Sequence, residues 1–107
     1  MKKVKNIFSK LPPAKKNEVF DILLKQKDIK IERITTLGQA TPQGKWLLEK
    51  TDEWVIVLQG KAKLRFAENK KLISMKTGDY IFIPAGTPHR VEWSDPKQKT
   101  IWLAIHF

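Results

Sequence analysis

The hydrophobic and polar positions of this chain follow two different periods. Residues 29–34 (IKIERI) and 61–66 (KAKLRF) alternate apolar and polar side chains, as strands with one buried face do. Residues 53–60 (EWVIVLQG) form a nearly continuous apolar run that ends at a glycine. Other short apolar runs between turn residues predict strands over 72–75, 80–83, 89–93 and 100–107. About seven short strands are typical of a β-sandwich or a small barrel.

The segment before residue 29 has a helical period instead. Two prolines precede residues 14–26, a position that suits a helix start. The apolar side chains of this segment fall on one stripe at helical spacing, namely Val19, Phe20, Leu23 and Leu24. We therefore predict one short helix over Ala14–Gln26 that packs outside the barrel. The expected organisation is an N-terminal helical arm over residues 1–28 and a β-barrel over residues 29–107, together in one domain.

The composition excludes several kinds of site. The chain has no cysteine, which removes disulfides, thiolate metal ligands and thiol nucleophiles. Its apolar runs are far shorter than the ~20 residues that a membrane-spanning helix needs. We find no apolar leader of the signal-peptide type, so the expected location is the cytoplasm, with no membrane partner.

The net charge of +10 raises the question of a nucleic-acid partner. Only Arg33, Arg65 and Arg90 among the 21 basic residues are arginines, so two-pronged contacts to bases or phosphates are scarce. The lysines are spread over the whole chain, mostly at expected turns and solvent-facing strand positions. This distribution favours solvated faces over specific nucleic-acid binding.

Two motifs in the second half of the chain carry the candidate chemistry. G-x5-P-x-G-x2-H matches Gly78, Pro84, Gly86 and His89, and E-x6-G matches Glu53 and Gly60. In this order and spacing they resemble the two motifs of the cupin family, and small single-domain bacterial cupins in particular. The resemblance covers about residues 30–107. It implies an all-β fold, a double-stranded β-helix or jelly-roll barrel, in which Glu53 and His89 point into the cavity.

The chain departs from the metal-binding pattern of the family. Metal-binding cupins usually place His-x-His three or four residues before the motif-one glutamate. Here those two positions fall on Leu47 and Glu49, or on Trp46 and Leu48. The resemblance therefore leaves Glu53, His89 and Glu49 as candidate metal ligands. It implies at most one weakly held divalent ion, zinc, iron, nickel or manganese, at partial occupancy.

Each candidate residue also has a structural explanation. His89 binds a metal or substrate, or it is held in the pocket by a hydrogen bond. Glu53 is a ligand, or it forms a salt bridge with Arg90 or Lys45. Glu49 lies in a charged run that is typical of a solvated loop.

Large aromatic residues complete the predicted ligand pocket. We assign Trp93 to it because Trp93 shares strand parity with His89, and we assign Phe82 as a second aromatic wall. The last strand has two apolar faces, and either the face of Ile105 or the face of His106 lines the cavity. Since a small barrel buries only one face, we predict a homodimer.

Three functions are consistent with these observations. The first is binding of a small molecule in the barrel cavity with weak or no metal. The second is a metal-dependent cupin enzyme of the oxygenase or isomerase type. The third is an interaction module that uses the basic surface. The missing His-x-His pair favours the first function over the second, and whether the chain is an enzyme stays open.

Overall fold

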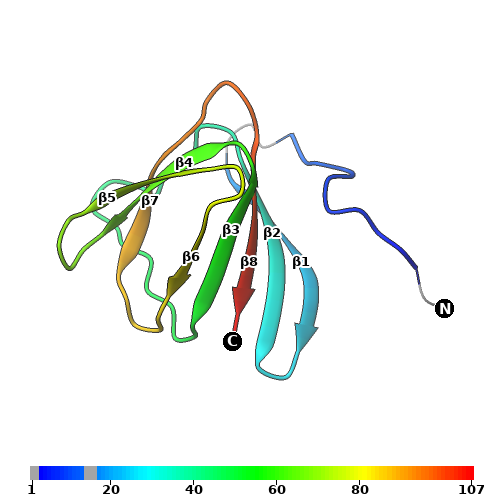
Figure 1. Cartoon of the computed structure of the whole chain (residues 1–107), viewed down its shortest axis with the longest axis horizontal. Coiled ribbons are helices and arrows are strands. Elements are labelled where there is room, and N and C mark those ends of the chain that lie inside the picture. The colour runs from blue at the N-terminus through cyan, green and yellow to red at the C-terminus, as the bar shows by residue number, and fades with distance from the viewer. Residues whose placement is uncertain (1–2, 14–16) are drawn as a thin grey trace.

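The computed structural model describes residues 3–13 and 17–107 and contains eight strands in two antiparallel sheets (Figure 1). The five-stranded sheet has the order β1 (Val19–Gln26), β2 (Ile29–Thr36), β8 (Thr100–His106), β3 (Glu53–Gln59) and β6 (Tyr80–Ile83). The three-stranded sheet has the order β5 (Leu72–Lys76), β4 (Lys61–Phe66) and β7 (His89–Ser94). The sheets face each other, as the all-β barrel prediction requires.

The predicted helix over Ala14–Gln26 is wrong, because residues 19–26 form strand β1. This strand pairs with β2 along its length, from Val19 opposite Thr35 to Gln26 opposite Ile29. The apolar side chains within residues 19–24 (VFDILL) fit either period, and the neighbouring strand decides between them. The part of the predicted helix over residues 14–16 lies outside the described residues. The boundary predicted at residue 28 falls in the turn between two paired strands.

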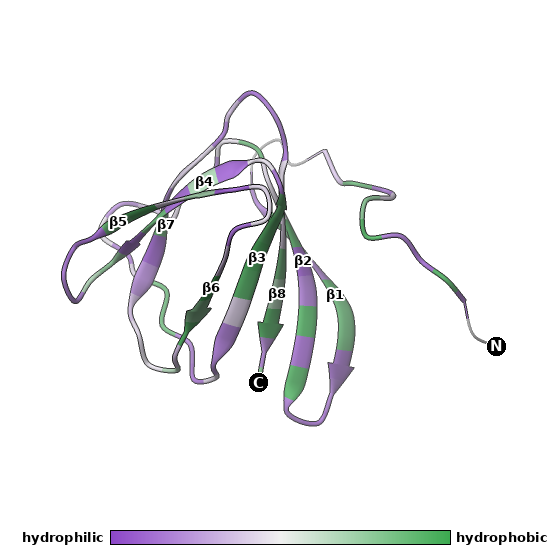
Figure 2. Ribbon diagram, in the orientation of Figure 1, coloured by the Kyte–Doolittle hydropathy of each residue, from purple (hydrophilic) through white to green (hydrophobic). Residues whose placement is uncertain are grey.

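The core lies between the two sheets and consists of alternate residues from their strands. It is formed by Val55, Val57, Ala62, Leu64, Met75, Ile83, Trp102 and Ala104. Figure 2 shows the alternation most clearly along β2, where apolar and polar bands follow one another. Gly60 makes the tight connection between β3 and β4, with φ of 102°, and a Cβ there would lie 2.7 Å from the Thr100 Cα.

The outer face of the five-stranded sheet retains exposed aromatic side chains. Trp54 and Tyr80 have ring centroids 5.3 Å apart, and Phe82 and Phe107 have ring centroids 6.3 Å apart. Phe82 is 50% exposed and Tyr80 is 65% exposed. This face therefore presents a group of exposed aromatic side chains to solvent.

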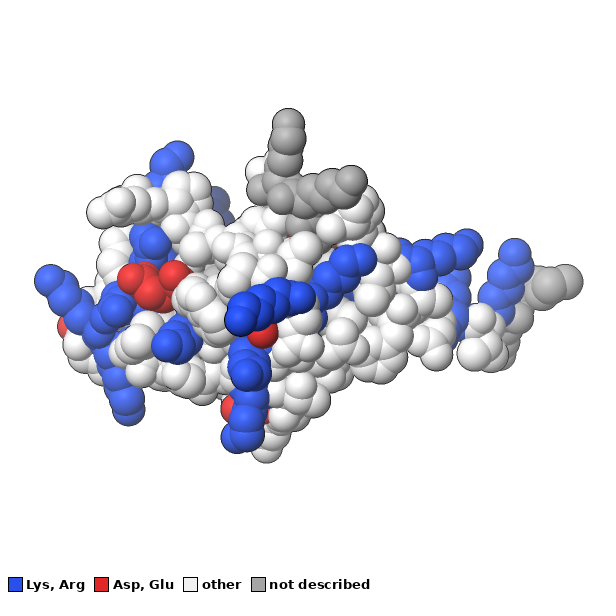
Figure 3. Space-filling model, turned by 90° about the horizontal axis from the view of Figure 1, so that it is seen from above, with Lys and Arg blue, Asp and Glu red and all other residues white. Residues whose placement is uncertain are grey.

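On the face seen in Figure 3, the basic side chains are spread widely. In Figure 3, lysine and arginine side chains extend from one end of the visible face to the other, with acidic side chains between some of them. Among the described residues, no helix is long and apolar enough to cross a membrane.

Candidate functional site

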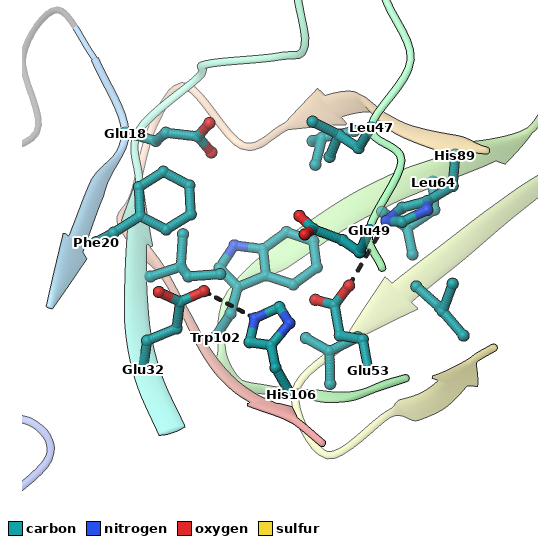
Figure 4. A pocket seen from close by; sticks show the side chains of 14 residues that line it. Glu18, Phe20, Glu32, Leu47, Glu49, Glu53, Leu64, His89, Trp102 and His106 are labelled. Atoms are coloured by element: carbon teal, nitrogen blue, oxygen red, sulfur yellow. Dashed lines mark hydrogen bonds and ion pairs between the residues drawn. The ribbon is translucent and has the colours of Figure 1, made fainter. Parts of the chain in front are cut away.

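One cavity lies between the two sheets, and charged side chains from both sheets reach it (Figure 4). Its volume is about 100 Å³. Its polar lining residues are Glu18, Glu32, Glu49, Glu53, His89 and His106. Apolar walls surround them, formed by Phe20, Ile34, Leu47, Val55, Leu64, Ile83, Val91 and Trp102.

The first polar pair joins the two sheets. Glu53 begins β3 and His89 begins β7, and the Glu53 Oε1 and His89 Nε2 atoms are 3.6 Å apart. The other ring nitrogen of His89, Nδ1, lies 2.8 Å from the carbonyl oxygen of Thr87. A hydrogen bond donated by Nδ1 to this carbonyl fixes the ring and directs Nε2 toward the cavity. The sequence motifs predicted both residues, and the structure brings them together.

The environment of His89 shifts its titration. Burial lowers the pKa of His89. The Glu53 carboxylate, the Thr87 carbonyl and the negative charge of Glu49 raise it by more than burial lowers it, so the pKa of His89 lies above its ordinary value. The imidazole is therefore easier to protonate than a free histidine. It can donate a proton or a hydrogen bond to a bound molecule near neutral pH.

The loop before β3 closes one side of the cavity. Leu47 and His89 exchange backbone hydrogen bonds, Leu47 N–H to His89 O at 2.6 Å and His89 N–H to Leu47 O at 3.1 Å. Gly86 N–H donates to the Glu49 carbonyl at 2.9 Å, and the φ of Gly86 is 76°. These contacts hold Glu49 at the cavity, although its side chain remains exposed. Glu49 is thus both a solvated loop residue and a lining residue.

A second polar pair was not predicted. His106, near the end of β8, has its Nε2 atom 2.9 Å from Glu32 Oε1 on the neighbouring strand β2. Both side chains are buried, with 8% of each exposed. The alternation Trp102, Ala104, His106 in the last strand contained the signal, and the structure shows that this face, not the face of Ile105, lines the cavity.

The two pairs form one alternating row of acids and imidazoles. Glu53 and His106 are direct partners on β3 and β8, both on the inner face. The row therefore runs from Glu32 through His106 and Glu53 to His89, across three strands of one sheet and onto the other sheet. Such a row can accept and donate hydrogen bonds at several points of one small ligand.

Glu18 adds a further carboxyl at the edge of the cavity, just before β1. Burial and the nearby negative charge of Glu32 raise its pKa above the ordinary value for a glutamate. Sequence reasoning missed Glu18 and Phe20 because both were placed on a helix outside the barrel. Their contribution depends on residues 19–26 being a strand of the wall.

Phe82 and Trp93 do not line this cavity, which corrects their assignment to the pocket. Phe82 alternates with the buried Ile83 on β6, so Phe82 points to the outer face. Trp93 shares parity with His89 in the sequence, but β7 has an irregularity against β4. Lys63 pairs with Trp93 and the next residue, Leu64, pairs with Val91. This bulge turns Trp93 outward, where the Lys63 ammonium lies 5.5 Å from its ring centroid.

Arg90, which was one candidate for a salt bridge with Glu53, has other partners in the structure. Arg90 binds Glu92 at 2.8 Å and donates to the carbonyl oxygens of Thr41, Pro42 and Lys45. It therefore anchors the long loop that contains Leu47 and Glu49. The partner of Glu53 in the cavity is His89.

The predicted metal ligands do not form a metal-binding cluster. In the described parts of the chain, no group of three or more His, Asp or Glu side chains is placed to hold one ion. His89 directs one nitrogen to Thr87 and the other to Glu53, and Glu32 already occupies Nε2 of His106. A tightly held ion needs at least three protein ligands with fixed geometry, so this arrangement does not fit one.

Comparison with known proteins identifies the fold and the family. A family model described as "Cupin domain" matches residues 34–106. A crystal structure described as a "putative mannose-6-phosphate isomerase" from Ralstonia eutropha JMP134 is 40% identical, with a TM-score of 0.93, over 98% of this chain and 97% of that chain. No protein with a curated functional description matches the chain.

More distant structures share the fold alone. A cupin superfamily protein from Desulfitobacterium hafniense DCB-2 is 17% identical with a TM-score of 0.75, over 91% of this chain and 83% of that one. The hydroxypropylphosphonic acid epoxidase of S. wedmorenis is 21% identical with a TM-score of 0.70, over 84% of this chain and 51% of that one.

Proposed function

Because the chain belongs to the cupin family, we propose that its cavity binds a small, hydroxyl-bearing molecule. One observation carries this proposal: two buried carboxylate–imidazole pairs, Glu53 with His89 and Glu32 with His106, border the same cavity. Carboxylates accept hydrogen bonds from hydroxyl groups, and imidazoles both donate and accept them. The Trp102 side chain gives the ligand an apolar surface, and its Nε1 is anchored to the Thr36 hydroxyl at 3.2 Å.

D-mannose is a suitable neutral probe, because the similar Ralstonia protein is described as acting on a mannose derivative. We expect calorimetry to detect mannose binding to the wild-type protein. Glu53→Gln should weaken binding about tenfold, which corresponds to ~1.4 kcal/mol. Glu68→Gln makes the same charge change in an exposed turn and is the matched control. Equal affinities of the two variants would refute the assigned cavity role of Glu53.

Isomerisation is the second candidate function, and the likeness to the Ralstonia protein favours it. An aldose–ketose isomerisation moves a proton between neighbouring carbons, so it needs a base and an acid but no net oxidant. The raised pKa of His89 suits it to the acid role. The Glu53 side chain lies 3.6 Å from His89 Nε2 at the same cavity, which places it for the base role. Incorporation of deuterium from heavy water into mannose 6-phosphate would support this candidate. His89→Gln should abolish the exchange.

The metal-dependent form of the enzyme and the basic interaction module remain weaker alternatives. Among the described residues the metal form lacks an assembled ligand set, and the lysines on the face seen in Figure 3 are spread across it. A cytoplasmic location remains part of the proposal. Gel shifts that persist at high salt would support a nucleic-acid partner, because non-specific binding weakens steeply with salt.

The homodimer is also part of the proposal. The outer face of the five-stranded sheet carries Trp54, Tyr80, Phe82 and Phe107. Burying such a patch against a second copy removes apolar area from water. Light scattering should give a dimer mass for the wild type and a lower mass for Phe82→Asp. A monomer mass for the wild type at high micromolar concentration would refute the dimer.

A further inference from the structure

A basic surface depression borders the acidic cavity. Its lining contains four lysines, Lys25, Lys27, Lys30 and Lys50, which we call the lysine rim. The depression also contains Asp28 and Glu49, so its lysines exceed its acidic residues by two. It shares Glu49 and His106 with the cavity, so the two spaces adjoin each other.

The strand register places part of the lysine rim on the inner face of the sheet. Ile34, Glu32 and Lys30 are alternate residues of β2, and the first two line the cavity. Along this strand the inner face therefore changes from apolar to acidic to basic. Lys30 pairs with His106 on β8, and its ammonium lies 4.0 Å from Glu32 Oε2. The side chain of Lys30 is 36% exposed, which leaves it accessible to a ligand.

A β-bulge brings Lys25 to the same face. Ile22 pairs with Glu32, but the register shifts between Ile22 and Leu24, so that Lys25 pairs directly with Lys30. Without this extra residue, Lys25 would point to the outer face, because alternate residues share a face. Bulges next to binding sites often redirect a side chain in this way. The bulge thus places two lysine residues opposite each other in the lining of the depression beside the cavity.

We infer that the lysine rim binds the phosphate group of a phosphorylated ligand whose hydroxylated body enters the cavity. A phosphate monoester carries about −1.5 to −2 charges at neutral pH, which matches the excess of lysines. The acidic interior would repel this group, so the charge pattern fixes the orientation of the ligand. Lysine is suited to the task because its compact charge binds phosphate without a fixed fork geometry. This inference rests on the proposed ligand-binding function of the cavity.

The test compares mannose 6-phosphate with mannose on the wild type and on Lys25→Met/Lys30→Met. Methionine keeps the unbranched shape and most of the length of the side chain, and it removes the charge. We expect the wild type to bind mannose 6-phosphate at least about tenfold more tightly than mannose, or ~1.4 kcal/mol. The double variant should lose this preference and keep its affinity for mannose. The preference should also shrink as salt is raised, because the lysines are exposed.

Lys61→Met/Lys76→Met is a closely matched control. These two lysines also face each other directly across neighbouring strands, but on the three-stranded sheet and outside the rim. Their loss changes the net charge by the same amount and should leave the phosphate preference intact. An equal loss in both double variants would assign the preference to overall charge and overturn the inference.

Inorganic phosphate tests the lysine rim without the cavity. Titration followed by NMR should shift the amide signals of residues 25–30 and of Lys50 in the wild type, and chloride at equal ionic strength should not. The absence of these shifts would overturn the rim inference even if mannose binds, in which case the proposed cavity function stands. Rim shifts without any sugar binding would support the phosphate site and refute the proposed function.

Discussion

The two carboxylate–imidazole pairs differ in what they connect. The Glu32–His106 pair joins neighbouring strands of one sheet, is buried on both sides and has a short 2.9 Å contact. The Glu53–His89 pair joins the two sheets across the cavity, with a longer 3.6 Å separation. A short buried contact within one sheet serves mainly to hold the wall together. A longer contact across the opening leaves room for a ligand to take the place of one of the two side chains as hydrogen-bond partner.

This comparison predicts the largest effect on stability at Glu32. We expect Glu32→Ala to lower the free energy of unfolding by ~3 kcal/mol, because it leaves the buried His106 ring without its partner. Glu53→Ala should cost only ~1 kcal/mol, since its contact is longer and His89 keeps its bond to Thr87. Urea denaturation measures both values. A larger loss of unfolding free energy for Glu53→Ala than for Glu32→Ala would contradict the view that the Glu32–His106 pair is the one that holds the wall together.

A smaller effect should appear in the pH dependence of stability. Folding raises the pKa of His89, so its contribution is fully present below the unfolded value of about 6.5 and is lost as pH rises through the folded value. Between pH 6 and pH 8.5, the wild type should therefore lose stability relative to His89→Gln. The free energies of unfolding of both proteins at these two pH values test this. If the unfolding free energy of the wild type relative to His89→Gln stays constant or increases with pH, the raised pKa of His89 is contradicted.

The smallest expected effect is on metal content. Two ligands, Glu53 and His89, with help from Glu49, can hold zinc, iron, nickel or manganese only weakly, so the purified protein should contain less than one ion per chain. His89→Ala should reduce this amount, and His106→Ala should leave it unchanged because Glu32 engages that ring. Elemental analysis gives the content per chain. One full ion in the wild type, lost in His106→Ala, would show that the second pair opens to form a metal site.

The sequence by itself determined the family, the all-β architecture and one of the two pairs. Strict alternation in residues 61–66 and the continuous run of residues 53–60 identify strands because side-chain direction repeats every two residues. The glycine and proline spacing before His89 fixed a turn whose backbone needs those residue types. These signals are local, so they can be recognised without knowing what lies across the barrel.

Only the tertiary structure decided the rest of the site. Residues 19–24 satisfy both helical and strand periods, and pairing with β2 made them a strand that brings Glu18 and Phe20 to the cavity. Trp93 was misplaced because a bulge breaks the alternation on β7. His106 could be assigned to the inner face only after its neighbours on β2 and β3 were known, since both faces of β8 are apolar. Strand pairing brings together residues that are far apart in the chain, and bulges change which face a side chain occupies. Neither can be recognised from a local sequence pattern.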